Sequence, residues 1–400
     1  MTRLHSTMTA PDKLPIATLG ARGAERLLHG HPWVFRSDIA TAPRVAAGLV
    51  DVRGAGGRKL GTALFSPTSE ITLRRLEADP DVAVDAAWWR QALVRAIDRR
   101  ASLAAHTTAY RLVHGEGDGL PSLVVDLYGD IVVLQLLSAG LETQRAHIVA
   151  ALQSLLSPAG ILARNDPSVR TREGLERTVE VLAGTVPDTI RVTEHGVHYL
   201  AALRTGQKTG AFLDQRDNRV LVGSRARGRA LDCFSYHGSF ALHLARNADH
   251  VTAVDVSEVA LARATENAAL NGLTNVTPVV ADVFEYLRAA KARGDRFETI
   301  VVDPPAFAKN RSSVSHAMRG YADINRLAMQ LLTPGGTMFT ASCSHHVHVP
   351  EFLEILAHAA SESGRDIAIR QLTLQPLDHP VLLTVPETGY LKGAILEAVS

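Results

Sequence analysis

The feature that most constrains the fold is a succession of short apolar runs, each followed by an aspartate, in the C-terminal half. The runs are 229–234, 251–256, 276–281 and 299–302, and their acids are Asp232, Asp255, Asp282 and Asp303. Helix-forming segments separate the runs, and alternation of strand and helix favours a parallel sheet covered by helices. Because the carboxyl ends of parallel strands share one edge of a sheet, we expect the four acids to line one rim of an α/β, Rossmann-like domain.

The turn after the first of these strands indicates the kind of ligand. Gly238 lies between the strand and a helix, and Asp255 lies about 20 residues past Asp232, where a doubly wound fold binds ribose hydroxyls. A G-x-G-x-x-G turn, typical of pyrophosphate binding, is missing. S-adenosylmethionine, a nucleoside without phosphate, fits this pattern. We expect Asp255 to bind its ribose, Asp282 its adenine amino group, and the turn containing Asp232, Phe234 and Gly238 its amino-acid portion.

A fifth strand, 337–340, leads to Cys343 on the same rim. Carbon 5 of a pyrimidine becomes nucleophilic once a thiolate adds to carbon 6, so a single cysteine here suits methylation of that carbon. Asp303 is placed to hydrogen-bond N3 and the amino edge of the base. His345 and His346 are candidates to remove the carbon-5 proton, although adjacent histidines after a strand commonly face solvent. Cys233, inside the first strand, is expected to pack in the core.

The remainder of the chain divides into two further segments. Residues 11–85 contain short apolar stretches broken by Gly and Pro, which indicates a small β-rich domain, and residues 86–190 combine a helix with two β-type runs. The domain with the acids then occupies 191–400. Two cysteines are too few for a disulfide framework or a self-contained zinc site, and a net charge of +1 indicates no polyanionic partner by itself. No run reaches the roughly 18 apolar residues of a membrane span, so we expect a cytoplasmic protein.

Several motifs together resemble the RlmI family of 23S ribosomal RNA cytosine-5 methyltransferases. They are 207–219 (QKTGAFLDQRDNR), 232–238 (DCFSYHG), 303–307 (DPPAF), 320–326 (GYADINR), 342–344 (SCS), and, outside that domain, 31–35, 111–121 and 386–393. The resemblance spans nearly the whole chain. It implies an N-terminal PUA domain, a central α+β domain, a class I methyltransferase domain, 23S rRNA as substrate, and Cys343 as nucleophile.

The resemblance also implies roles for individual residues. Arg216 becomes a candidate for the cofactor carboxylate, and Lys309, Arg319 and Tyr321 become candidates for RNA contact. The chain departs from the family at His237-Gly238-Ser239, where Thr-Gly-Gly is usual, and at Ala306 and Ala322, where the family has Lys. Two lost cations bear on which nucleotide is modified more than on the reaction.

Two other functions stay open from the sequence. Asp303-Pro304-Pro305 followed by an aromatic residue also suits direct methylation of an exocyclic amine, although Phe307 comes one residue late and Cys343 would have no task. An RNA-binding ribosome assembly factor without catalysis is the other alternative. A homodimer is compatible with the sequence, which does not decide the point.

Overall fold

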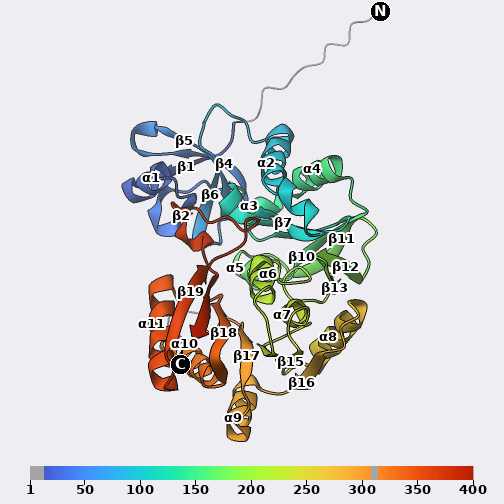
Figure 1. The fold of residues 1–400 in the computed structure, drawn as a ribbon. Coiled ribbons are helices and arrows are strands. Elements are labelled where there is room, and N and C mark those ends of the chain that lie inside the picture. Colours follow the sequence, from blue (N-terminus) through green and yellow to red (C-terminus); the bar gives the residue numbers. More distant parts are fainter. Residues whose placement is uncertain (1–12, 308–313, 400) are drawn as a thin grey trace, which may run out of the picture.

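The computed structural model describes residues 13–307 and 314–399, which form three sheets and one hairpin (Figure 1). The first sheet has the order β2-β6-β5-β4-β1-β3, and α1 (Ala21–Leu28) packs against it. Its strands are β1 (Ile16–Leu19), β2 (Trp33–Phe35), β3 (Ile39–Thr41), β4 (Gly48–Arg53), β5 (Lys59–Phe65) and β6 (Ile71–Glu77). All pairings are antiparallel except β1 with β4. This is the β-rich part expected from the Gly- and Pro-broken pattern.

The second sheet has the order β11-β10-β9-β8-β7, and helices α2 and α4 share a hydrophobic core with it. Its strands are β7 (Ala109–His114), β8 (Leu123–Tyr128), β9 (Ile131–Leu136), β10 (Gly160–Asn165) and β11 (Thr178–Gly184). The helices are α2 (Ala86–Asp98), α3 (Ala139–Glu142), α4 (Arg145–Leu156) and α5 (Val169–Arg172). The side chain of Asp85 caps α2 by accepting from the Trp88 amide, and Trp89 fills the core beneath the helix.

The third sheet has the order β16-β15-β14-β17-β18-β20-β19. Its strands are β14 (Arg229–Cys233), β15 (His250–Asp255), β16 (Val276–Val280), β17 (Phe297–Val302), β18 (Leu332–Ser342), β19 (Ile367–Thr373) and β20 (Lys392–Ala398). The first five are parallel, whereas β20 is antiparallel to both neighbours. The chain order reverses between β14 and β17, which is the point where such sheets bind ligands.

Helices cover both faces of the third sheet because its strands alternate their buried side chains. Leu231 and Cys233 point to one face and join a core with α9 (Val283–Arg293), α10 (Val314–Gln330) and α11 (Val349–Ser363). Ala230 points to the other and joins α6 (Arg216–Gly223), α7 (Ser239–Leu244) and α8 (Glu258–Leu270). Cys233 is fully buried, as expected for a core residue. None of the helices in the described residues combines the length and apolar character needed to cross a membrane.

A two-stranded hairpin links the second and third sheets. Its strands are β12 (Thr189–Glu194) and β13 (Val197–Ala202). The Glu194 carboxylate is buried and accepts two hydrogen bonds from the Arg219 guanidinium, at 2.6 and 2.7 Å. Burial alone would raise the pKa of Glu194, but the charge of Arg219 and a hydrogen bond from His243 hold it well below its usual range. This ion pair fixes α6 and α7 to the hairpin.

A second buried ion pair joins segments that lie far apart in the sequence. The Asp378 carboxylate accepts from both terminal nitrogens of Arg216, at 2.8 and 3.0 Å, and from the Arg111 amide at 2.9 Å. Arg100 donates to the Asp378 carbonyl at 2.9 Å. Burial would raise the pKa of Asp378, yet His379 and Arg216 hold it below its usual range. The second sheet, the start of α6 and the C-terminal segment therefore meet at one carboxylate.

We predict that Asp378→Ala destabilises the protein by about 3–5 kcal/mol, because the change removes the only buried carboxylate paired with Arg216 in the described residues and leaves its buried guanidinium with the half-exposed Asp217 alone. Urea unfolding followed by circular dichroism measures this as a lower midpoint. The matched control is Glu70→Ala, which breaks the exposed ion pair between Glu70 and Arg36 and should leave the midpoint nearly unchanged. Equal midpoints for the two variants would contradict the role given to Asp378.

Candidate active site

Asp232 lies under the turn that connects β14 to α7. One oxygen of its carboxylate accepts from the Ser235 hydroxyl at 2.7 Å and from the Ala241 amide at 2.9 Å. The other oxygen is buried and has no hydrogen-bond partner within the described residues. Burial, with the nearby charges of Asp303 and Asp255, raises the pKa of Asp232 to about 7. Asp232 thus orders the turn and keeps one acceptor available.

The turn itself is tightly constrained. Phe234 and Tyr236 have positive φ values of 62° and 51°, and Gly238 has a φ of 84°. A Cβ on Gly238 would come within 2.9 Å of the Ala264 Cβ, so only glycine lets α8 pack this closely. Asp255, at the end of β15, accepts from the Tyr236 amide at 2.9 Å and braces the turn from the neighbouring strand. Strain of this kind concentrates at ligand-binding turns.

Asp282 and Asp303 occupy the ends of the next two strands in the sequence. Asp282 is exposed and caps α9 by accepting from the Glu285 amide at 3.0 Å. Asp303 accepts from the side-chain amide of Gln215 at 2.8 Å. Burial, followed by the charge of Asp214, raises the pKa of Asp303 to about 7. The Gln207–Arg219 motif therefore contacts the rim through Gln215.

The four acids share one electrostatic property that tests the fit of the expected cofactor. In the part of the chain that the structure describes, none of them forms an ion pair with a lysine, arginine or histidine. A row of carboxylates without cationic partners attracts a positively charged ligand. S-adenosylmethionine carries a sulfonium and an ammonium group, and the unpartnered Asp232 oxygen offers an acceptor for the latter. The residues at the rim therefore fit this cofactor.

Cys343 follows β18 and lies partly buried near Asp303. Burial, with the charge of Asp303, raises the pKa of its thiol to about 11, while Lys208 and Lys392 act in the opposite direction. The Lys392 ammonium donates to the carbonyls of Ser344 at 2.5 Å and of Tyr390 at 3.0 Å. Burial lowers the pKa of Lys392 to about 8. Burial and the Asp303 charge thus favour the neutral thiol, whereas the two lysines favour the thiolate.

Sequence reasoning missed two other residues that surround Cys343. Lys208 pairs with Asp214, and its ammonium lies 4.8 Å from the centre of the Phe212 ring. The Tyr390 hydroxyl donates to the same Asp214 carboxylate at 2.7 Å. Both Lys208 and Tyr390 lie inside motifs that the sequence displays, 207–219 and 386–393. Their proximity to Cys343 could not be read from spacing, because more than 130 residues separate Lys208 from the cysteine.

Two residues assigned to ligand contact from the resemblance have structural tasks instead. The Arg216 side chain is 1% exposed and paired with Asp378 and Asp217, so it is not directed to a cofactor carboxylate. Tyr321 is fully buried; its hydroxyl bonds to the Ser344 hydroxyl at 2.9 Å and its ring packs on Phe307. Tyr321 thus presents no surface to RNA and supports the segment that carries Cys343.

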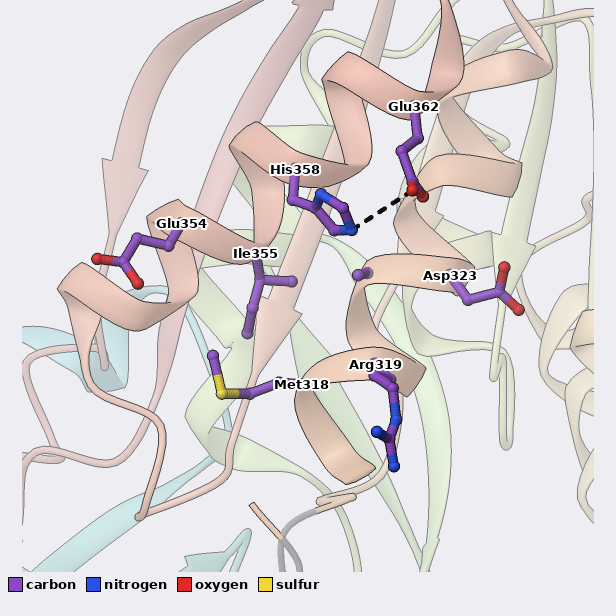
Figure 2. A pocket seen from close by; sticks show the side chains of 8 residues that line it. Met318, Arg319, Asp323, Glu354, Ile355, His358 and Glu362 are labelled. Carbon is purple, nitrogen blue, oxygen red and sulfur yellow. Dashed lines mark ion pairs between the residues drawn. The ribbon is translucent and has the colours of Figure 1, made fainter. Parts of the chain in front are cut away.

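The other two residues expected at RNA lie away from the rim or cannot be placed. Lys309 falls outside the described residues. Arg319 is exposed on α10 and lines a hollow between α10 and α11 (Figure 2). Met318, Ile355 and the ion-paired His358 and Glu362 line the same hollow, which includes neither Cys343 nor any of the four acids. An RNA contact by Arg319 stays a prediction.

A further hollow, of about 350 Å³, borders the constrained turn on the side of α8. Gly206, Gln207 and Gly210 form one wall and Tyr236, His237 and Ser257 the other. His237 is buried between the rings of Tyr199 and Tyr236, and burial lowers the pKa of its imidazole to about 4. His237, which stands where the family usually has Thr, therefore places a neutral imidazole ring in the turn after β14.

Two family profiles match the sequence. Residues 110–378 match the S-adenosylmethionine-dependent methyltransferase family, and residues 17–78 match a PUA-like domain. The ribosomal RNA large subunit methyltransferase I of Klebsiella pneumoniae (strain 342) is 42% identical over 383 residues, which cover 93% of this chain and 96% of the relative. The chain belongs to the ribosomal RNA large subunit methyltransferase I family. It is an S-adenosylmethionine-dependent methyltransferase, and the expected cofactor is confirmed.

Solved structures share the fold of this family member along most of the chain. A protein of Streptococcus mutans assigned as an S-adenosylmethionine-dependent methyltransferase superposes with a TM-score of 0.82 at 23% identity, covering 96% of this chain and all of that one. A methyltransferase solved in complex with SAH gives the same TM-score at 24% identity, with the same coverage. The Rossmann-like class I fold, preceded by a β-rich PUA-like domain, is therefore confirmed.

We predict that S-adenosylmethionine binds more tightly as the pH rises from 6 to 7.5. Asp232 and Asp303 have pKa values of about 7, so each is largely protonated at the lower pH and ionised at the higher. Only the ionised carboxylates attract the cationic cofactor, which implies an affinity gain of about tenfold across this range. Isothermal titration calorimetry measures it. Asp232→Asn keeps the hydrogen bonds to the turn and should flatten the profile; an unaltered slope in this variant would contradict the assignment.

Proposed function

We propose that this enzyme methylates carbon 5 of a cytosine in 23S ribosomal RNA through a covalent bond between Cys343 and the base. The observation that carries the proposal is the position of the Cys343 thiol beside Asp303, with Lys208 and Lys392 close by. Direct transfer of a methyl group to an exocyclic amine requires no thiol nucleophile. The printed name of the relatives and the PUA-like domain support ribosomal RNA as the acceptor.

Bound S-adenosylmethionine supplies an electrophilic methyl group. We assign its ribose to Asp255, its adenine amino group to Asp282, and its amino-acid portion to the turn of Asp232, Phe234 and Gly238. Each of these residues lies at a strand end or in the turn that follows β14. Asp303 follows β17, which lies between β14 and β18 in the sheet, so Asp303 lies between this region and Cys343.

Cys343 begins the reaction by losing its proton and bonding through Sγ to carbon 6 of the cytosine. The carbon 5–carbon 6 double bond supplies electron density to carbon 5, which takes up the methyl group as the bond from that group to the cofactor sulfur breaks and leaves its electron pair on the sulfur. A base then removes the carbon-5 proton, the double bond re-forms, and the Sγ–carbon 6 bond breaks. The thiolate leaves with its electron pair and takes up a proton from solvent, and the base releases the carbon-5 proton to solvent, so the enzyme regains its initial state.

Asp303 couples recognition of the base to activation of the thiol. Its pKa of about 7 lets it hold a proton for N3 of the cytosine at neutral pH. Burial raises the pKa of Cys343, and the charge of Asp303 raises it further when Asp303 is ionised. Protonation of Asp303 removes that charge, so the thiol ionises more readily when the cytosine is in place, with Lys208 and Lys392 stabilising the thiolate.

The decisive experiment is nucleoside mass spectrometry of unmodified 23S rRNA incubated with the enzyme and labelled S-adenosylmethionine. We predict label in 5-methylcytosine, loss of at least about 10³-fold in rate for Cys343→Ala, and unchanged cofactor binding in that variant. Cys233→Ala is the matched control, because this buried cysteine lies on β14 and should not affect transfer. Label in a methylated exocyclic amine, indifferent to Cys343, would instead indicate direct transfer at Asp303-Pro304-Pro305.

The state of the RNA provides a separate prediction. A cytosine attacked at carbon 6 must leave its stack, which costs a few kcal/mol and is easier in RNA free of ribosomal proteins. We therefore expect faster methylation of protein-free 23S rRNA than of the assembled large subunit, measured as initial rates at equal RNA concentration. Equal rates on the two substrates would contradict this prediction.

A further inference from the structure

A hollow of about 210 Å³ lies where the first two sheets meet the C-terminal segment. Trp33 on β2 provides one wall, Arg111 and His114 on β7 another, and His345 and Tyr390 close the side toward the methyltransferase domain. Residues from three separate parts of the chain thus build one cavity. It does not include Cys343 or Asp303, so it is distinct from the position of the reacting base.

The walls combine flat rings with hydrogen-bond acceptors. The rings of His345 and His114 lie 5.4 and 6.2 Å from the Tyr390 ring, centre to centre. Glu116 accepts from the Trp33 indole at 2.8 Å and Glu387 accepts from His31 at 3.1 Å. Each carboxylate uses one oxygen in these bonds, and the second oxygen of each forms no hydrogen bond with another described residue. The cavity therefore offers stacking surfaces and carboxylate acceptors together.

The charge of the cavity disfavours a phosphate group. Arg111 is its one lining cation among the described residues, and its guanidinium is bound at 2.8 and 3.0 Å to the buried carboxylate of Asp126. Glu116 and Glu387 stay uncompensated by any lysine or arginine in the described chain. Carboxylates accept from the exocyclic amino groups of bases, and aromatic rings stack on base faces.

We propose that this cavity binds one unpaired nucleobase of the RNA, a neighbour of the target cytosine that bears an exocyclic amino group. The inference rests on the proposed function, since it takes RNA as the substrate. His345 comes two residues after Cys343, so their Cα atoms lie at most about 7 Å apart. A base held here therefore belongs to a nucleotide close to the target. Glu387 binds the amino group and His345 and Tyr390 stack on the ring.

The test uses full-length 23S rRNA transcripts in which each base flanking the mapped cytosine is changed in turn to uracil, which has no exocyclic amino group. For the substitution that replaces the base bound in the cavity, we expect KM for the RNA to rise roughly tenfold with kcat unchanged. Glu387→Gln should raise KM for the native transcript by a similar factor and leave KM for the substituted transcript unchanged. Glu354→Gln, the same change on the exposed surface of α11, is the control.

A second pair of variants separates binding from catalysis. His345→Ala should raise KM roughly tenfold while kcat holds, whereas His250→Ala, which removes an exposed ring at the start of β15 and outside the cavity, should change neither. A fall in kcat for His345→Ala at constant KM would make this residue a proton acceptor and overturn the proposal. Methylation that is indifferent to every flanking base would also overturn it. Failure of the wild-type enzyme to methylate any transcript would instead reject the proposed function.

Discussion

The buried carboxylate of Asp378 is the interaction on which the arrangement of the site depends. It binds the Arg216 side chain at the start of α6 and the Arg111 amide on β7, while Arg100 holds the carbonyl of the same residue. Residues just before Arg216 carry the contacts to the rim: Gln215 bonds to Asp303, and Asp214 binds both Lys208 and Tyr390. A buried charge that loses its partner is strongly destabilising, so this ion pair favours one position of α6 relative to β7 and the C-terminal segment. The second sheet thereby sets the position of the catalytic rim.

Charge is distributed unevenly across that rim, and the distribution matches the proposed chemistry. In the region proposed to bind the cofactor, Asp232 and Asp255 have no cationic partner among the described residues, which favours a cationic ligand there. On the thiol side, burial and the charge of Asp303 raise the pKa of Cys343, and Lys208 and Lys392 act in the opposite direction. Asp303 lies between the two regions, with a pKa near neutrality. Its protonation state can therefore respond to cofactor and base alike, which links the two binding events electrostatically.

Local sequence signals predicted the local structure well. Helix α8 shows such signals at both ends, since Ser257 caps its start and Gly272, at a φ of 66°, follows its end. The strands ending in acids were also predicted, because alternating apolar runs and turn residues act over a few positions. The fifth strand was expected over 337–340, yet β18 begins at Leu332. There the pairing of Leu332 with Phe297 on β17 decides the boundary.

Long-range pairing explains the remaining differences and unites the two proposals. The partner of Arg216 lies 162 positions away, and no local pattern marks Asp378 as that partner. The same C-terminal segment that carries Asp378 contacts the first sheet through Glu387 and His31, contributes Tyr390 to the cavity, and continues into Lys392 beside Cys343. RNA held between the first two sheets would therefore touch the segment that positions the lysine and the tyrosine at the thiol. Recognition of a neighbouring base and activation of Cys343 then depend on one short stretch of chain.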